Sequence, residues 1–316
     1  MRSVAFVLFP KFSMIGLTSA LEPIRVVNRF SEPEFTWRFV SADGQPVAAS
    51  NGIPVSAGEA ITSMQRPDIA IFCASYEADQ GLSRPVLSCA RKLARQGVML
   101  GAVDSGQIML AAAGVLDGYR AAVHWEALAG FRETYGAVNV TDAAYEIDRD
   151  RMTAATGSAA IDMMLNYITK VIGLEQSLFA AEQLGHRLLP GEASEARLPP
   201  ELRYQVDHPR IVRILRAMEE NPEELLSTEE LAAIGGLSVR QMERLFARHL
   251  GQPPRRLYRE IRLVRAERLL TYSKLGVTDV AMACGFTSVA EFSRAYKAQH
   301  GDPPSRHRRR EINPGY

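Results

Sequence analysis

The first half of the chain alternates short apolar runs with stretches whose apolar residues recur every three or four positions. Runs that are apolar throughout predict strands buried on both faces, and the stretches between them predict amphipathic helices. Strands of this kind that alternate with helices are typical of a parallel sheet covered on both sides. We therefore expect an α/β domain with strands near residues 4–9, 37–41, 68–72 and 98–103, and with helices near 18–30 and 85–96.

The pattern changes after about residue 185. Residues 186–200 lose their periodicity and collect Pro, Gly, Ser and Glu, which is typical of a linker. Beyond them the apolar residues keep helical spacing, and no strand-like run occurs before residue 310. The sequence therefore predicts a first domain over residues 1–185, a linker over 186–204 and an all-α second domain over 205–316.

The second domain contains an internal repeat, in which residues 231–254 align with residues 280–304. Each copy reads as a short helix, a turn that contains glycine, and a second helix, which is the helix-turn-helix pattern. The second helix of each copy has one apolar face for packing and one polar face that is free for a DNA major groove. The residues that recur in the two copies are Gly236 and Gly285, Ser238 and Ser288, Arg244 and Arg294, Pro253 and Pro303, and Pro254 and Pro304.

An α-helical repeat used for protein contacts is the alternative interpretation, but two copies are too few for a solenoid. The net charge of the whole chain is +1, from 37 Lys and Arg against 36 Asp and Glu, which on its own argues against a nucleic acid partner. The charge is unevenly distributed, however. Residues 1–204 hold 18 basic and 22 acidic side chains, whereas residues 205–316 hold 19 and 14. This asymmetry favours phosphate binding by the second domain.

Residues 207–310 resemble the DNA-binding domain of the AraC/XylS family of transcription regulators. The resemblance rests on the double helix-turn-helix, on RLVRAERLL at residues 262–270 and on GFTSVAEFSRAYKAQHGDPPSRHR at residues 285–308. It implies two recognition helices that read successive major-groove segments about 34 Å apart. The residues expected to face DNA are Arg240, Glu243 and Arg244 in the first helix, and Ala290, Ser293 and Arg294 in the second.

Arg244 and Arg294 are the first candidates for base or phosphate contacts, since arginine pairs bidentately with guanine. We expect Arg248, Arg255, Arg256 and the basic tail at residues 306–310 to face solvent or phosphate.

In the first domain, residues 101–126 predict a strand that ends at Val103, a turn, and a helix that begins near Gln107. Such a turn lies at the carboxyl end of a parallel sheet, where α/β folds bind ligands. Ser105 therefore suggests a hydrolase with His124 as base and Glu22 or Asp104 as third member. Gly-x-Ser-x-Gly is absent, so a helix cap for Ser105 and a core position for His124 stay open as alternatives.

Residues 1–175 resemble the class I glutamine amidotransferase-like, PfpI-type domain that is joined to AraC-type modules in one group of regulators. The matching segments are residues 4–29, 113–125 and 145–165. The resemblance implies a flavodoxin-like parallel sheet and, in the enzymes of this fold, a cysteine at the elbow. Asp104 stands at that position here. Because an aspartate offers no thiolate, the domain is predicted to be a sensor rather than an enzyme.

The same resemblance matches Glu22 to the acidic residue that neighbours the elbow, so Glu22 and Asp104 are predicted to share a pocket. Two carboxylates in one pocket favour a cation, to which a nearby Trp125, Trp37 or Tyr119 would add a cation–π contact. Similar regulators respond to arginine, glycine betaine, carnitine and related metabolites. The expected ligand-binding residues are Glu22, Asp104, Ser105, His124 and Trp125.

Three cysteines without a CxxC pair suggest neither a disulfide framework nor a metal site, and no cofactor is expected. The opening apolar run is too short for a signal peptide, and no run reaches 18 apolar residues. We expect a cytoplasmic homodimer that binds double-stranded DNA and a small effector, with RNA polymerase as a further partner and no membrane contact. It would be a transcription activator; the alternative is an amidotransferase-like or hydrolase-like enzyme that uses Ser105 and His124 and is tethered to DNA.

Overall fold

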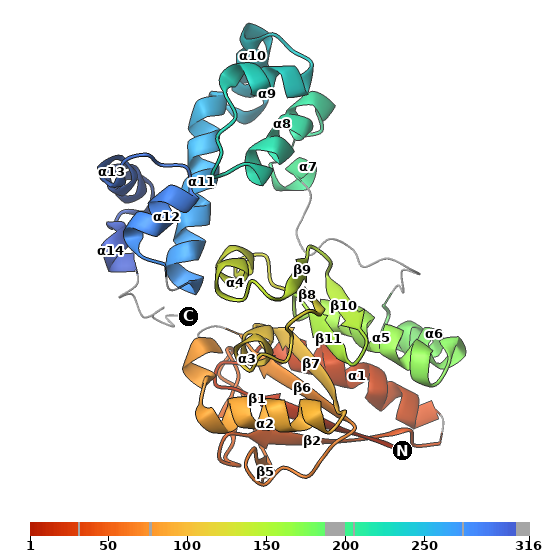
Figure 1. Cartoon of the computed structure of the whole chain (residues 1–316). Coiled ribbons are helices and arrows are strands. Elements are labelled where there is room, and N and C mark those ends of the chain that lie inside the picture. The colour runs from red at the N-terminus through yellow and green to blue at the C-terminus, as the bar shows by residue number, and fades with distance from the viewer. Residues whose placement is uncertain (31, 76–77, 187–199, 205, 274, 308–316) are drawn as a thin grey trace. The chain divides into compact units, whose positions relative to one another are not determined.

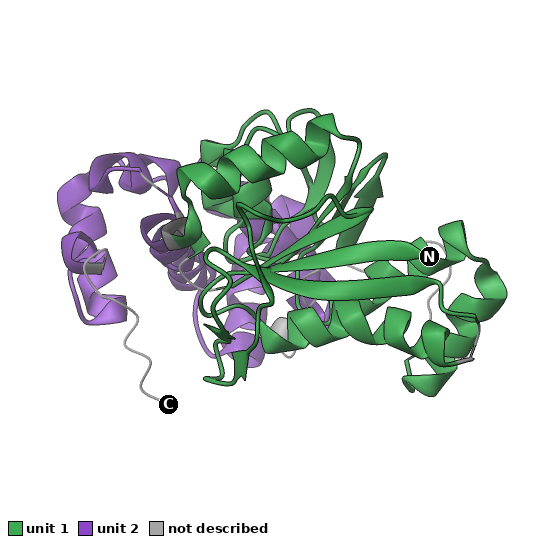
Figure 2. Cartoon of the chain, turned by 90° about the horizontal axis from the view of Figure 1, so that it is seen from below, with its two compact units in different colours: residues 1–197 green, residues 198–316 purple. Residues whose placement is uncertain are grey.

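The computed structural model describes residues 1–30, 32–75, 78–186, 200–204, 206–273 and 275–307 (Figure 1). The chain divides into two compact units, residues 1–197 and residues 198–316, which Figure 2 shows in separate colours. The division between the units falls inside the predicted linker over 186–204. Most of that linker, residues 187–199, and the basic tail from residue 308 onward lie outside the described residues.

Unit 1 is built on a seven-stranded sheet in which all neighbouring strands are parallel except β10 and β11. This confirms the predicted α/β class, and four strands coincide with the four apolar runs. From one edge to the other the strands are β10 (Tyr145–Asp148), β11 (Arg151–Ala154), β7 (Met99–Asp104), β6 (Ile69–Ala74), β1 (Arg2–Leu8), β2 (Phe35–Ser41) and β5 (Glu59–Ala60).

Helices cover both faces of this sheet (Figures 1 and 2). On one face α1 (Met14–Phe30), α5 (Ala159–Val171) and α6 (Leu174–Gln183) pack against one another, and on the other lie α2 (Arg84–Arg95) and α3 (Gln107–Ala112). Because both faces are covered, every residue of β6 is buried, including the alternate side chains that a one-sided sheet would expose.

Shorter elements complete unit 1. The pairs β3–β4 and β8–β9 form two small sheets of their own. No periodic pattern signals these pieces, because two or three residues are too few to show one. Their bounds are β3 (Val47–Ala48), β4 (Pro54–Val55), β8 (Arg120–Ala122), β9 (Asn139–Thr141), the 3₁₀ helix η1 (Ala78–Gly81) and α4 (Leu128–Thr134).

Unit 2 is helical throughout its described part, as predicted. Two helix-turn-helix motifs, α9–α10 and α12–α13, are joined by the long helix α11 (Figure 1). The helices are α7 (Pro200–Arg203), α8 (Pro209–Glu220), α9 (Thr228–Gly235), α10 (Val239–Leu250), α11 (Pro254–Tyr272), α12 (Val277–Ala283), α13 (Val289–His300) and α14 (Pro304–His307).

Contacts from α11 and from a loop join the two motifs of unit 2. Arg262 of α11 donates from Nη1 to the carbonyl oxygens of Cys284 (3.3 Å) and Gly285 (3.0 Å), in the turn between α12 and α13. Tyr258, one turn earlier, donates its hydroxyl to the carbonyl of Asn221, in the loop between α8 and α9. A Cβ at Gly285 would lie 2.7 Å from the carbonyl oxygen of Glu223 in the same loop. The two motifs are therefore fixed relative to one another.

Candidate functional site

Asp104 occupies a sharp turn at the carboxyl end of β7. Its φ is 59°, in the left-handed region that few residues other than glycine adopt. Ala74, the last residue of β6, lies opposite it in the sheet, and α3 begins three residues later at Gln107. The neighbours β1 and β6 mark the point where the strand order reverses, and ligands bind outside the carboxyl ends of strands at such a point. The turn thus has the predicted elbow geometry, with an aspartate at its tip.

Two glycines allow the elbow to approach the surrounding backbone. A Cβ at Gly106 would lie 2.0 Å from the carbonyl oxygen of Phe72, and a Cβ at Gly16 would lie 2.7 Å from Cγ1 of Val103. The elbow therefore packs closely between β6 and the first turn of α1, and neither Gly106 nor Gly16 has room for a side chain.

Four polar side chains act on the carboxyl of Asp104. Burial raises its pKa, and the negative charge of Glu126 raises it further. The interaction with His124 and the hydrogen bonds from the hydroxyl groups of Ser75 and Ser105 lower it, but the net shift is upward. Ser105 Oγ donates to Asp104 Oδ1 over 3.4 Å. The ionised carboxylate is thus incompletely compensated, and a bound cation would stabilise it.

His124 and Trp125 lie in the segment after β8. The backbone N–H of Glu126 donates to Nδ1 of His124 over 3.3 Å, and the Glu126 carboxylate lies 3.8 Å from the same atom. The rings of His124 and Trp125 are 5.5 Å apart between centroids. The structure therefore brings Asp104, Ser105, His124 and Trp125, four of the five predicted ligand-binding residues, into one region.

The fifth, Glu22, was predicted to share the pocket with Asp104, and the structure corrects this. Its carboxylate accepts a hydrogen bond from Nε of Arg25 (2.7 Å) and lies 2.6 Å from Nη2 of the same side chain. The largest effects on the pKa of Asp104 come from burial and from His124, Ser75, Ser105 and Glu126, and Glu22 is not among these. The residue of α1 that lies against the elbow is Gly16, more than one helical turn earlier. The second carboxylate beside Asp104 is that of Glu126.

Ser105 is neither a helix cap nor part of a nucleophile–base pair. The residue that precedes α3 as its N-cap is Gly106, and no side chain caps this helix. The hydrogen bond of the Ser105 hydroxyl goes to Asp104. Between Ser105 and His124, both within the described residues, the structure records no hydrogen bond. The hydrolase alternative thus lacks the nucleophile–base contact that it requires.

The native thiols are equally unsuited to nucleophilic chemistry. Burial raises the pKa of Cys73 on β6, and the charge of Asp104 raises it further. Burial also raises the pKa of Cys89 on α2, and that of Cys284 to about 12. A thiol with a raised pKa carries little thiolate near neutrality.

Of the three aromatic residues suggested for a cation–π contact, Tyr119 is already covered by the chain's own cations. The guanidinium of Arg149 lies 3.6 Å from its ring centroid and that of Arg151 lies 4.7 Å away. Trp37 lies on β2 and packs against the apolar core. Trp125, beside His124, is therefore the aromatic residue that lies in the region of the elbow.

Sequence reasoning missed three residues of the site: Ser75, Glu126 and Gln107. Ser75 directly follows β6, and Asp104 is the last residue of the neighbouring strand β7. Because parallel strands end at the same edge of the sheet, the sequence could have indicated that Ser75 lies near Asp104. Gln107 is fully buried and donates from Nε2 to the carbonyl oxygens of Ala122 (3.0 Å) and Ala154 (2.8 Å). It thereby ties the start of α3 to β8 and β11, while its Oε1 is buried without a partner among the residues described.

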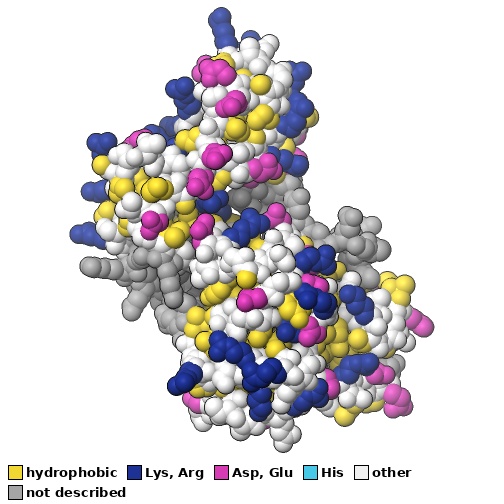
Figure 3. All heavy atoms as spheres, in the orientation of Figure 1, with side chains coloured by type: hydrophobic (Ala, Val, Ile, Leu, Met, Phe, Trp, Pro, Cys, Tyr) yellow, Lys and Arg dark blue, Asp and Glu magenta, His cyan; other side chains and the backbone are white. Residues whose placement is uncertain are grey.

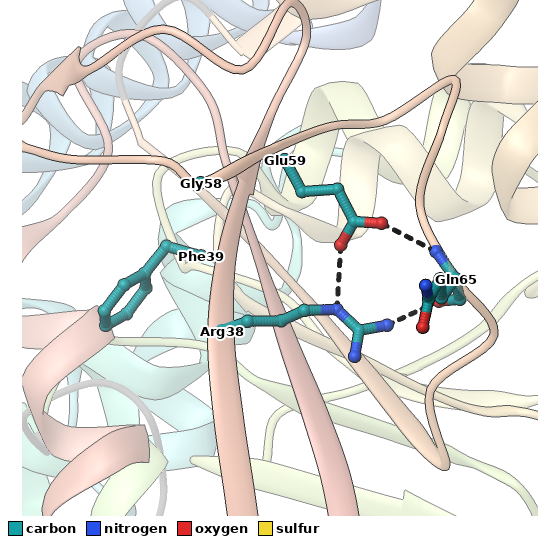
Figure 4. Close-up of a pocket in the computed structure, with 5 residues that line it drawn as sticks. All are labelled: Arg38, Phe39, Gly58, Glu59 and Gln65. Carbon is teal, nitrogen blue, oxygen red and sulfur yellow. Dashed lines mark hydrogen bonds and ion pairs between the residues drawn. The ribbon is translucent and has the colours of Figure 1, made fainter.

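A separate surface pocket of about 450 Å³ lies at the β2–β5 edge of the sheet and is lined by Arg38, Phe39, Gly58, Glu59 and Gln65 (Figure 4). Arg38 Nε lies 2.9 Å from Glu59 Oε2, and the other oxygen of Glu59 accepts from the backbone N–H of Gln65 over 2.7 Å. The opposite charges of this pocket already neutralise each other, so it offers no unbalanced charge to a ligand.

The outer faces of α10 and α13 carry the residues predicted to contact DNA. Arg240, Glu243, Arg244, Ala290 and Arg294 are exposed, and Ser293 is half-buried. Lys and Arg side chains project from unit 2 near these helices in the view of Figure 3. The exposure meets the geometric requirement for groove contact, and the contact itself stays a prediction.

Over the described ranges, no helix is long and apolar enough to cross a membrane. Within the same parts of the chain, no group of three or more His, Cys, Asp and Glu side chains is arranged to hold a metal ion.

Comparisons with known proteins match both units. Residues 2–170 match the sequence model of the DJ-1/PfpI family, and residues 231–310 match that of a helix-turn-helix domain. The chain is 40% identical over 303 residues to the HTH-type transcriptional regulator CdhR of Pseudomonas aeruginosa, covering 96% of this chain and 90% of the relative. It is 36% identical over 304 residues to the HTH-type transcriptional regulator GbdR of the same species, covering 96% and 83%.

A solved structure of an AraC family transcriptional regulator from Pseudomonas putida superposes with a TM-score of 0.55 at 28% identity. It corresponds to 58% of this chain and to the whole of that chain.

Proposed function

Because the chain belongs to the AraC family of transcriptional regulators, with a DJ-1/PfpI domain as its first unit, we propose that it controls transcription in response to a small cationic metabolite. Its relatives over nearly the whole length are named transcriptional regulators, so the protein is a regulator rather than an enzyme. The observation that carries the choice of ligand is the half-buried carboxyl of Asp104 at the elbow, with a second carboxylate beside it.

The effector that this region suits is a nitrogenous cation such as arginine, glycine betaine or carnitine. The positive group would lie between Asp104 and Glu126, where it would lower the cost of ionising a buried carboxyl. Trp125 would add a cation–π contact of about 0.5–2 kcal/mol. His124, whose Nδ1 accepts a backbone hydrogen bond, and Ser105 complete the wall of the proposed site.

Unit 1 would bind the effector and dimerise, and unit 2 would bind promoter DNA in the cytoplasm. Arg240, Glu243 and Arg244 of α10 would enter one major-groove segment, and the outer face of α13 would enter the next. We infer that the effector favours one arrangement of the two units, with a coupling of about 1–3 kcal/mol, and that this arrangement activates RNA polymerase.

Calorimetric titration of the full chain with a panel of amines, guanidines and quaternary ammonium compounds tests the ligand. We expect one class of cation to bind the wild type, and we expect Asp104→Asn to weaken its binding at least about tenfold, since the neutral amide lacks the charge. Asp142→Asn is the matched control, because Asp142 is 76% exposed and pairs at the surface with Arg132. Equal binding by wild type and Asp104→Asn, or binding of no cation at all, would contradict the proposal.

A further inference from the structure

The two recognition helices are held in the same way, so their outer positions can be compared one by one. Ser238 Oγ accepts the backbone N–H of Gln241 at the start of α10, and Ser288 Oγ accepts that of Glu291 at the start of α13, both over 3.3 Å. On the inner faces Met242 and Phe246 in α10 correspond to Phe292 and Tyr296 in α13, and all four are fully buried. The caps and the buried pairs have the same spacing, so positions fifty residues apart are equivalent.

These equivalent outer positions carry different side chains. Two pairs are identical, Val239 and Val289, and Arg244 and Arg294. At five other outer positions one helix has a charge where its counterpart has a small or neutral side chain. The differing pairs, α10 first, are Arg240 and Ala290, Gln241 and Glu291, Glu243 and Ser293, Ala247 and Lys297, and Arg248 and Ala298.

The first turn of α10 offers free charged groups. Within the described residues, Arg240, Glu243 and Arg244 make no recorded hydrogen bond or ion pair, although Arg240 and Glu243 lie three positions apart on one face. The N-terminal residues of a recognition helix are those that meet base edges. A free guanidinium there pairs bidentately with O6 and N7 of guanine, and a carboxylate accepts from N4 of cytosine. Glu243 would be repelled by phosphates, which favours a base edge as its partner.

The first turn of α13 offers a different surface. Val289, which is 39% exposed, and Ala290, which is also exposed, make the first turn of α13 apolar. At the equivalent positions α10 has Val239, which is half-buried, and the exposed and charged Arg240. Ser293, at the position of Glu243, is half-buried and uncharged. In the major groove an apolar side chain of this size packs against the 5-methyl group of thymine.

We propose that the two motifs read major-groove segments of different composition. Helix α10 reads a G·C pair through Arg240 and Glu243, whereas α13 reads thymine through methyl contacts from Val289 and Ala290. This inference rests on the proposed function, in which both helices enter DNA.

Selection of random duplex DNA by the full-length protein tests the inference. We expect the wild type to enrich two segments about ten base pairs apart, one with an invariant guanine and one with thymine. Arg240→Ala should remove the guanine preference from the first segment, at a loss of affinity of about five- to one-hundredfold, and leave the second unchanged. Ala290→Arg should replace thymine by guanine in the second segment alone.

Lys297→Ala is the matched control on the outer face of α13, because removal of a phosphate-facing cation lowers the affinity for all DNA sequences about equally. Replacing the selected thymine by uracil, which lacks the methyl group, should weaken DNA binding by the wild type more than DNA binding by Ala290→Arg, which keeps the methyl contact of Val289 alone. If the wild type enriches no sequence, the proposed function itself fails. If it enriches a sequence but Arg240→Ala keeps the same guanine preference, or Ala290→Arg changes the first segment, the assignment of bases to helices is wrong.

Discussion

Asp104 combines an unusual backbone conformation with a half-buried carboxyl at one position. Burial raises the pKa of its carboxyl in the folded protein above the value in the unfolded chain, and the charge of Glu126 adds to this shift. The folded state therefore binds a proton at Asp104 more readily than the unfolded state does. The resulting stability is fully present below the unfolded pKa and is lost as the pH rises through the folded pKa.

Asp104→Asn should remove this loss, because the amide cannot ionise. In urea unfolding at about pH 7 we expect the variant to be more stable than wild type, and the difference should narrow as the pH falls toward about 4. Asp142→Asn, at an exposed carboxylate, should show no such narrowing. A variant that is less stable than wild type near neutrality would show that the ionised carboxylate is compensated within the fold.

Gly106 is a position in the elbow that no residue with a side chain can occupy without a clash. In Gly106→Ala the new Cβ would meet the backbone oxygen of Phe72, which cannot rotate away, at 2.0 Å. We expect a loss of about 3 kcal/mol or more in the free energy of unfolding. Gly58→Ala, where the Cβ meets nothing within 4 Å and φ is ordinary, should change it by less than about 0.5 kcal/mol. Similar losses for both variants would contradict the close packing of the elbow.

At the scale of residues, the sequence located the elbow and two of its partners, Ser105 and His124, but not Ser75 or Glu126. Asp104 could be found because a buried strand, a turn and a helix follow one another within a few residues. Glu22 was placed wrongly because the contact between α1 and the elbow depends on the rotation of that helix. The residue that makes this contact, Gly16, has no side chain to signal it.

At the scale of elements, the turn between α12 and α13 packs against the loop that precedes α9 and so fixes the distance between the two motifs. Gly285 has a φ of 68° and faces the loop of Glu223, whereas Gly251 has a nearly equal φ of 67° and faces open space. Both glycines therefore adopt the left-handed conformation, but of the two only Gly285 lies where a Cβ would clash with neighbouring atoms.

Gly251→Ala should cost about 1 kcal/mol through backbone strain, and Gly285→Ala about 1–3 kcal/mol more through the clash. Thermal unfolding of the full chain measures both. Because the clash pushes the motifs apart, Gly285→Ala should also weaken binding to DNA that carries both segments more than binding to DNA that carries one. An equal effect of the two substitutions on both DNAs would show that the loop does not set the spacing.

The elements that the sequence predicted are those with a long, uniform pattern. Strands β1, β6 and β7 are buried over most of their length, so their apolar runs are nearly continuous, whereas Thr36 and Arg38 interrupt that of β2. The caps and buried faces of α10 and α13 repeat at a fixed spacing. The pairs β3–β4 and β8–β9 were missed because their pairing is tertiary and leaves no local period.

At the scale of the whole molecule, the division into an acidic and a basic half explains how a chain of net charge +1 can bind DNA. The shift in composition near residue 185 was enough to separate the two units in sequence. The proposed effector site could be assembled only from the structure, since it joins the ends of β6 and β7 to the segment after β8.

If unit 2 makes the DNA contacts, the salt dependence of DNA binding should change when basic residues of unit 2 are replaced and not when those of unit 1 are. The affinity should fall linearly with salt on a double logarithmic plot, and Arg248→Ala should reduce the slope by about 1. Arg95→Ala, at an exposed arginine of unit 1, should leave the slope unchanged. Fluorescence anisotropy across a salt series measures both, and a smaller slope for Arg95→Ala would place DNA contacts on unit 1.

The left-handed backbone at position 104 also bears on how such a sensor evolves. Aspartate and asparagine are among the few residues other than glycine that adopt this conformation readily. A lineage can therefore exchange a charged elbow for a neutral one by a single mutation without rebuilding the turn. The backbone of the elbow thus restricts the choice of residues at this position, and the residues that it permits include two that favour effectors of different charge.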